Sequence, residues 1–157
     1  MQITRARPED ADALTEIAFA AKRHWGYPER WIQLWRDVLT VTPEFVAANP
    51  TFSAIEDDRI VGFSSLTTKP RPDLTHLWVM PSAMGRGFGR ALFASAIAEA
   101  KALGFSAFEV EADPNAELFY VHMGAIRIGT NVSEVDGVRR ELPLLLYQVS
   151  QPEFAGQ

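Results

Sequence analysis

The sequence predicts a single α/β domain built on a mixed sheet. The chain has 157 residues, which is about the size of one domain. Segments with the period of a strand and segments with the period of a helix follow one another in the order β-α-α-β-β-β-α-β-α-β-β, a pattern typical of an α/β domain. No internal repeat, low-complexity tract or linker divides the chain. We therefore assign the domain to residues 1–150 and expect residues 151–157 to form a loose tail.

The first third of the chain predicts one strand and two helices. Weak alternation favours a strand over residues 2–6. A helix follows at Pro8, because proline is tolerated in the first turn and the acids after it complement the helix dipole. This helix ends near Gly26. Its apolar stripe is Leu14, Ile17, Ala18 and Ala21, and a second helix from Pro28 has a stripe of Trp31, Leu34, Trp35 and Val38. A brief helical turn is expected between Thr42 and Asn49.

After Pro50 the apolar residues alternate with a period of two. We expect strands over 51–56 and 59–67 around an Asp57-Asp58 turn, and a third strand over 74–80 that Pro81 stops. Good helix formers then predict a helix from Phe88 to Leu103, with Gly104 as its terminating glycine. Its expected buried stripe is Leu92, Phe93, Ala96, Ile97, Ala100 and Leu103.

The last third predicts three strands and one short helix. Residues 105–111 alternate as a strand, which the sequence Asp113-Pro114-Asn115 breaks. A short helix through residues 120–123 is closed by Gly124. Two strands over 125–135 and 139–149 flank an Asp136-Gly137 turn, which favours a hairpin.

The composition excludes several classes of function. With 47% hydrophobic residues the chain can form one sizeable core. Fifteen Lys and Arg against twenty Asp and Glu give a net charge of −5, so we expect no nucleic-acid partner. There is no cysteine, which removes disulfides, thiolate metal sites and a cysteine nucleophile. The three histidines lack metal-ligand spacing, and we expect no metal.

Nothing in the sequence predicts a membrane partner. The longest segment free of Asp, Glu, Lys and Arg, residues 74–85, is far shorter than the roughly 20 apolar residues of a spanning helix. The first residues lack the apolar core of a secretory signal. We therefore expect a cytoplasmic protein.

The most informative segment is a glycine-rich turn, residues 85–90 (GRGFGR), between a predicted strand and a predicted helix. Glycines let the backbone approach a ligand, and the free N–H groups of a helix start attract a phosphate. A tight turn without a ligand is the alternative. The segment does not fit the dinucleotide fingerprint G-x-G-x-x-G/A, because the third glycine of that motif is missing. It does not fit the P-loop either, because no lysine follows a glycine.

Two motifs resemble those of the GCN5-related N-acetyltransferase (GNAT) family. Residues 84–89 match its acetyl-CoA signature Q/R-x-x-G-x-G/A at both glycines, with Met84 in place of Gln or Arg. Residues 113–124 match its N-x-x-A-x-x-F-Y-x-x-x-G segment, with Asp113 in place of Asn. The order of elements also agrees from residue 2 to residue 149.

The resemblance implies a GNAT-like fold and acetyl-CoA as cosubstrate. The sheet would be mostly antiparallel, splayed between the fourth and fifth strands and flanked by helices, with pantetheine entering the gap. The residues that the resemblance implies for the coenzyme are Leu77, Trp78, Val79, Met84, Gly85, Arg86, Gly87, Phe88, Gly89, Arg90, Asn115, Phe119 and Tyr120. Asn115 would take over the role of the missing motif asparagine, and an N–H near Val79 would stabilise the oxyanion.

The resemblance also implies direct attack of an amine on the thioester. The chain has no cysteine and no G-x-S-x-G elbow for an acyl-enzyme, which agrees with direct transfer. Tyr120 matches the family tyrosine that acts as general acid, while a packed aromatic beside Phe119 is the alternative. Glu109 and His76 are candidate bases. Alternatively, each of these two residues is part of a solvated strand face or is a satisfied polar group of the core. A chain of water molecules could then serve as the base.

The acceptor side is expected between the first two helices and the last hairpin. Trp25, Tyr27 and Trp31 are the candidate substrate-binding residues, whereas Trp31 and Trp35 would alternatively pack on the sheet. Basic residues beside them are either carboxylate ligands or simply solvated. We expect a small-molecule or peptide amine as partner, and a homodimer is an open alternative. The alternatives to acetyl transfer are a longer acyl-CoA, or an acyl-CoA-binding regulatory module without turnover.

Overall fold

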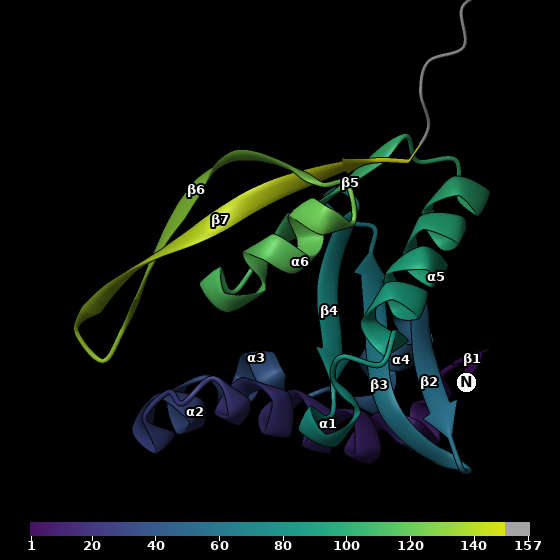
Figure 1. Ribbon diagram of the computed structural model, residues 1–157, viewed down its shortest axis with the longest axis horizontal. Coiled ribbons are helices and arrows are strands. Elements are labelled where there is room, and N and C mark those ends of the chain that lie inside the picture. The colour runs from purple at the N-terminus through teal and green to yellow at the C-terminus, as the bar shows by residue number, and fades with distance from the viewer. Residues whose placement is uncertain (150–157) are drawn as a thin grey trace, which may run out of the picture.

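The computed structural model describes residues 1–149, so the expected tail at residues 151–157 lies outside the described residues. Seven strands form one sheet in the order β1-β2-β3-β4-β5-β7-β6, and β4–β5 is its parallel pair (Figure 1). The strands are β1 (Gln2–Arg5), β2 (Thr51–Glu56), β3 (Arg59–Thr67), β4 (Asp73–Val79), β5 (Ala107–Glu111), β6 (Ile126–Val135) and β7 (Val138–Gln148). The helices are α1 (Ala11–His24), α2 (Glu29–Leu34), α3 (Arg36–Leu39), α4 (Pro43–Ala48), α5 (Phe88–Ala102) and α6 (Glu117–His122). The predicted fold class is confirmed.

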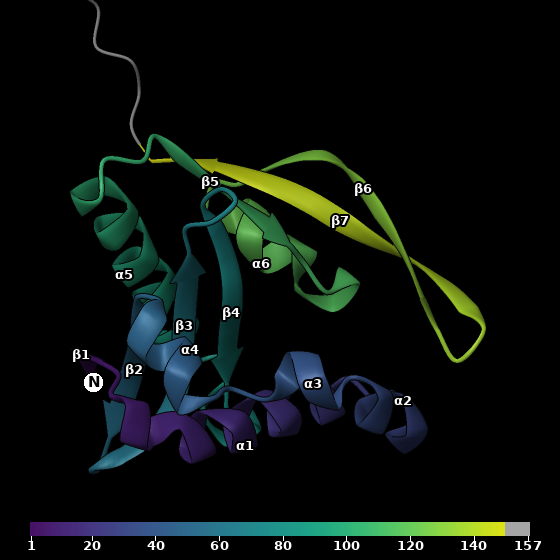
Figure 2. The same cartoon turned by 180° about the vertical axis from the view of Figure 1, so that it is seen from behind.

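Helices cover both faces of the sheet (Figures 1 and 2). Helices α1 and α4 lie on one face of β2–β4, where Leu14, Ile17 and Phe63 share an apolar cluster. Helix α5 lies on the other face, and its Phe93 joins a cluster that continues to α6, β5 and β7. Within residues 1–149 no helix has the length and apolar character needed to cross a bilayer.

The sheet opens between β4 and β5. The two strands pair at a single register position, Asp73 with Glu109, and the amide of Glu109 donates to the carbonyl of Pro72 at 3.1 Å. Beyond that point β4 continues on β3 alone, while β5 turns away with β7 and β6 (Figure 1). The splay between the fourth and fifth strands is therefore confirmed.

Tight turns set the two hairpins as predicted. Asp57 and Asp58 adopt positive φ of 51° and 63°, and Asp136 and Gly137 adopt 52° and 77°. Consecutive left-handed residues give the type I′ geometry that matches the twist of the flanking strands. The bounds of β2 and β3 agree with the expected ones.

The predicted stripe of the second helix is wrong in part. Leu34 and Val38 are 55% and 68% exposed, and Ile32 and Leu39 are buried instead. The helix breaks at Trp35, which separates α2 from α3 and changes the face that points inward. Leu103, predicted at the end of the α5 stripe, is 47% exposed and lies at the C-cap, one residue beyond the helix end at Ala102.

Candidate active site

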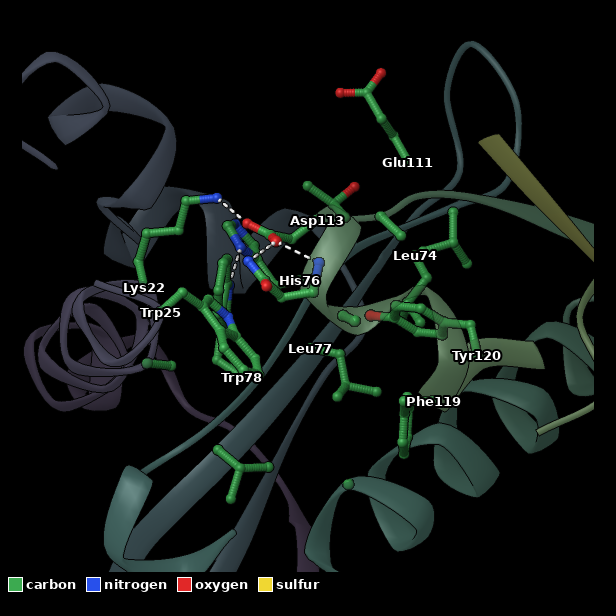
Figure 3. A pocket seen from close by; sticks show the side chains of 18 of the residues that line it. Lys22, Trp25, Leu74, His76, Leu77, Trp78, Glu111, Asp113, Phe119 and Tyr120 are labelled. Atoms are coloured by element: carbon green, nitrogen blue, oxygen red, sulfur yellow. Dashed lines mark hydrogen bonds and ion pairs between the residues drawn. The ribbon is translucent and has the colours of Figure 1, made fainter. Parts of the chain in front are cut away.

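A cavity of about 700 Å³ lies where β4 and β5 separate (Figure 3). Its walls come from β4, the start of α5, the end of β5 and α6, with α1 and β7 at one side. Eleven of the residues expected to bind the coenzyme line it: Leu77, Trp78, Val79, Met84, Gly85, Gly87, Gly89, Arg90, Asn115, Phe119 and Tyr120.

The splayed edge of β4 offers unpaired backbone groups. The amide of Met80 donates to the carbonyl of Val61 at 2.8 Å, while Val79 lies opposite Gly62. In an antiparallel ladder, hydrogen-bonded and non-hydrogen-bonded pairs alternate. Leu77 and Val79 therefore direct their N–H and C=O groups away from β3 and toward the gap, whereas the backbone of Trp78 is engaged with Phe63.

The glycine-rich turn brings backbone N–H groups to the other side of the cavity. Gly85 and Gly87 have φ of 74° and 91°, in the left-handed region that favours glycine. Gly87 is the N-cap of α5, and among residues 1–149 no side chain caps that helix start. The first-turn N–H groups of α5 thus remain available to an anion, and the helix dipole favours one there.

Two residues of this turn do not bring their side chains to the cavity. The guanidinium of Arg86 pairs with the Glu56 carboxylate at the end of β2. Phe88 is buried in an apolar cluster with Ala54 and Leu92. Neither side chain lines the cavity in this structure.

The Tyr120 side chain lies on α6, and its hydroxyl points toward the cavity (Figure 3). Its ring packs against Phe93 and Phe119, with centroid distances of 6.0 and 5.1 Å. Burial, and then the charges of Asp113 and Asp73, raise the pKa of Tyr120 above its usual value. The hydroxyl therefore stays protonated at neutral pH, and it donates to no other group within residues 1–149.

His76 lines the cavity but is a weak base. Its Nδ1 accepts a hydrogen bond from the indole N–H of Trp78 at 3.0 Å, so Nε2 carries the proton of the neutral ring. Burial lowers the pKa of His76 to about 4. A general base works best with a pKa near the operating pH, which His76 does not have.

Glu109 lies outside the cavity. Its carboxylate pairs with Arg71 at 2.8 Å, beside the single β4–β5 pair. Glu111, two residues further along β5, is the acid of this strand that reaches the cavity, where it accepts from Asn131 at 2.7 Å. Burial and the charges of Glu109 and Glu111 raise the pKa of Asp73 to about 6. Within the described residues, no three His, Asp or Glu side chains are placed to hold a metal ion.

A charged cluster at the α1 side of the cavity was not predicted from the sequence. Lys22 on α1 donates to Oδ2 of Asp113 at 2.7 Å (Figure 3). Arg140 on β7 donates to the Tyr27 hydroxyl at 2.8 Å, and that hydroxyl donates to Asp113 at 2.9 Å. Burial works against the ionised form of Asp113, yet Lys22 and the other donors lower its pKa. Burial lowers the pKa of Lys22, and the attraction of Asp113 opposes this effect.

The aromatic residues expected on the acceptor side take different places. Trp25 lines the cavity, and so does Trp35. Tyr27 belongs to the charged cluster, where burial and the charge of Asp113 raise its pKa to about 12. Trp31 lies outside the cavity and stacks on Tyr27 with a centroid distance of 6.0 Å. The ammonium of Lys22 lies 4.4 Å from the centre of the Trp35 ring.

A sheet that opens beside an uncapped, glycine-rich helix start is the architecture of an acetyltransferase domain. The family model for the acetyltransferase (GNAT) domain matches residues 40–140, and the chain belongs to this family. The resemblance in the two motifs is thereby confirmed. Comparison with curated protein sequences gave no match.

Solved structures share the fold over nearly the whole chain. A GCN5-related N-acetyltransferase from Rhodopseudomonas palustris is 24% identical, with a TM-score of 0.76 and 94% of each chain covered. The PaiA N-acetyltransferase of Thermoplasma acidophilum, solved in complex with coenzyme A, is 19% identical, with a TM-score of 0.73 over 94% of this chain and 98% of its own. The ribosomal-protein-S18-alanine N-acetyltransferase of Escherichia coli is 16% identical, with a TM-score of 0.73 over 98% and 97%.

Proposed function

We propose that this protein transfers the acetyl group of acetyl-CoA to a primary amine of a small molecule or peptide, by direct attack within a ternary complex. The observation that carries the proposal is one cavity that combines the free edge of β4, the uncapped start of α5 and the Tyr120 hydroxyl. In the reaction the amine nitrogen forms a bond to the acetyl carbon and the carbon–sulfur bond breaks. The amine loses a proton, and CoA leaves as the thiol.

The coenzyme would bind through backbone groups more than through side chains. The N–H groups at the start of α5, together with Arg90, suit a diphosphate, because unpaired amides and the helix dipole both favour an anion. The backbone N–H and C=O groups of Leu77 and Val79 that point into the gap can form hydrogen bonds with the amides of pantetheine. Pantetheine would then pair with β4 as an additional strand does. Backbone donors also explain why Met84 can replace the polar residue of the family signature.

Two groups of the chain would stabilise developing charge. The N–H of Val79 suits the acyl oxygen as that oxygen becomes negative. The Tyr120 hydroxyl suits the departing sulfur. A thiol has a pKa of about 8.5, below the raised pKa of the Tyr120 phenol, so complete proton transfer from this phenol to a free thiolate is uphill. Tyr120 therefore acts as a hydrogen-bond donor while the bond breaks, rather than as the full general acid that the family motif implies, and the proton that the nitrogen releases after attack completes the thiol.

At neutral pH the acceptor is mostly an ammonium ion, so it loses one proton before the nitrogen attacks, and this first proton is best accepted by water at the cavity mouth. His76 is neutral with a pKa of about 4, and Glu109 is paired with Arg71 outside the cavity. Glu111 is the carboxylate at the rim and can receive a proton through water.

The test has two parts. Calorimetric titration with CoA measures coenzyme binding, and thiol release from acetyl-CoA in the presence of an amine panel measures turnover. Binding with turnover supports the proposal. Tight binding without turnover on any amine would instead identify an acyl-CoA-binding module. Faster release from propionyl-CoA or butyryl-CoA than from acetyl-CoA would assign a longer acyl group.

A further inference from the structure

We infer that the acceptor of the proposed reaction is a primary amine that also carries a carboxylate, and that Arg140 binds this carboxylate with Lys22 beside it. The inference rests on the proposed function and names its substrate class. It starts from the charged cluster at the cavity wall, where two buried cations, Lys22 and Arg140, share one carboxylate, Asp113.

The Asp113 carboxylate is fully occupied without Arg140. Lys22 donates to it at 2.7 Å and the Tyr27 hydroxyl at 2.9 Å. The backbone amide of Asn115 donates at 2.8 Å and its side-chain amide at 2.9 Å. Arg140 lies 3.8 Å from Oδ2, beyond hydrogen-bond distance. Lys22 neutralises Asp113, and the positive charge of Arg140 is left in excess.

The guanidinium of Arg140 is fixed in place yet has unused donors. Its side chain is 11% exposed, and it lies 5.0 Å from the ring centre of Tyr27 and 4.9 Å from that of Trp35. Within residues 1–149 the Tyr27 hydroxyl is its one hydrogen-bond acceptor. A guanidinium has five N–H donors in a planar fork that matches a carboxylate. Since Arg140 lines the cavity, a carboxylate from the acceptor can reach the donors that Tyr27 leaves unused.

The excess charge also selects against other acceptors. A polyamine or a basic peptide would place further positive charge beside Arg140 and Lys22, in a partly desolvated site where like charges repel strongly. The opposing charge on the cavity wall is Glu111, whose side chain is exposed at the end of β5 and accepts from Asn131. An amino acid meets both requirements of the site: its carboxylate can pair with Arg140, and its amine remains free to face the gap between β4 and β5.

Binding of product analogues tests the inference without any turnover. The probes are N-acetylglycine, N-acetyl-L-leucine and N-acetyl-L-phenylalanine, each compared with its carboxamide in calorimetric titrations of the CoA-saturated protein. These pairs differ only in the carboxylate. A charge-assisted pair predicts about 10- to 100-fold tighter binding of at least one acid than of its amide. Equal affinities, or no binding of any acid, would overturn the inference.

Turnover adds a second readout. Thiol release is measured with glycine, leucine, phenylalanine and β-alanine against their amides, and rates are compared per mole of unprotonated amine. We expect kcat/KM about 10- to 100-fold higher for an acid than for its amide. Equal rates would overturn the inference and leave the proposed function intact. If no amine reacts, the proposed function fails, and the product-analogue titrations still decide on the carboxylate. Preference for 2-aminoethylphosphonate over β-alanine would assign a phosphonate instead.

The variants Arg140→Gln and Arg139→Gln form a matched pair. Both remove one positive charge from neighbouring positions of β7, but Arg139 is 69% exposed and pairs with Glu141 at 3.2 Å. We expect R140Q to bring the acid-to-amide ratio close to one and R139Q to retain it. Should R140Q not fold, Arg140→Lys keeps the charge and loses the fork, and an acid-to-amide ratio at least threefold below that of the parent is then expected. A parental ratio in a folded Arg140 variant contradicts the assignment.

Discussion

Replacing Tyr120 by phenylalanine removes one hydroxyl from the cavity and leaves the ring in its packing. The ring contacts with Phe93 and Phe119 need no hydroxyl, and the oxygen donates to no group of residues 1–149, so stability should change little. What is lost is a hydrogen bond to the sulfur as its charge develops. Such a bond to a charged group is worth about 1.5–3 kcal/mol, which corresponds to a fall in kcat of about 10- to 150-fold.

The coenzyme affinity should stay within about twofold, because an interaction made mainly in the transition state lowers kcat rather than ground-state binding. Burial, Asp113 and Asp73 raise the pKa of Tyr120, so the phenol is protonated between about pH 6 and pH 9. The ratio of parent to variant kcat should therefore be flat over that range.

Thiol release with the best acceptor of the amine panel measures kcat, and calorimetry measures CoA binding. Tyr147→Phe is the matched control, because Tyr147 packs in the same cluster but does not line the cavity. An unchanged kcat in Y120F, or an equal loss in Y120F and Y147F, would refute the role given to the hydroxyl.

Four further substitutions, one of them a control, test other parts of the protein. Gly87→Val places a branched side chain at φ 91°, where the diphosphate would approach, and should weaken CoA binding at least about tenfold by calorimetry. Gly104→Val at φ 85° is equally strained but away from the cavity, and equal loss in both variants would count against the diphosphate site. The pKa of Asp73 is about 6 in the folded protein, above the unfolded value near 3.9, so the unfolding free energy should fall as pH rises from about 4 to 6. Asp73→Asn should remove that slope in urea titrations and stabilise the protein at pH 7, and a persisting slope would exclude this carboxyl as its source. Glu109→Gln should alter kcat/KM by less than about threefold, because the carboxylate pairs with Arg71 outside the cavity, and a loss beyond tenfold would restore it as a base.

Features encoded by neighbouring residues were predictable from the sequence. The Asp57-Asp58 and Asp136-Gly137 turns depend on residues that tolerate left-handed backbone, and their hairpins formed as expected. The turn at residues 85–90 and Tyr120 belong to short motifs whose resemblance to those of the family indicated their place in the site. The structure brings both to one cavity.

Features that depend on distant residues were missed. Lys22, Asp113 and Arg140 come from α1, the segment that follows β5, and β7, and no local pattern links them. The one available signal was Asp113 in place of the family asparagine, since a buried carboxylate needs a cation. The break at Trp35 was also missed, because the apolar spacing continues through it while the backbone does not.

The gap between β4 and β5 is braced at two ends. Asp73 and Glu109 join the strands at the apex, and across the mouth the ion pair of Lys22 with Asp113 links α1 to the chain that follows β5. A further ion pair across the mouth links Arg30 on α2 to Asp136 at the tip of the β6–β7 hairpin, at 2.9 Å. These contacts fix the width of the gap in the absence of a ligand. A ligand that binds between β4 and β5 therefore meets a preorganised site, and little of its binding free energy is lost to rearrangement of the two strands.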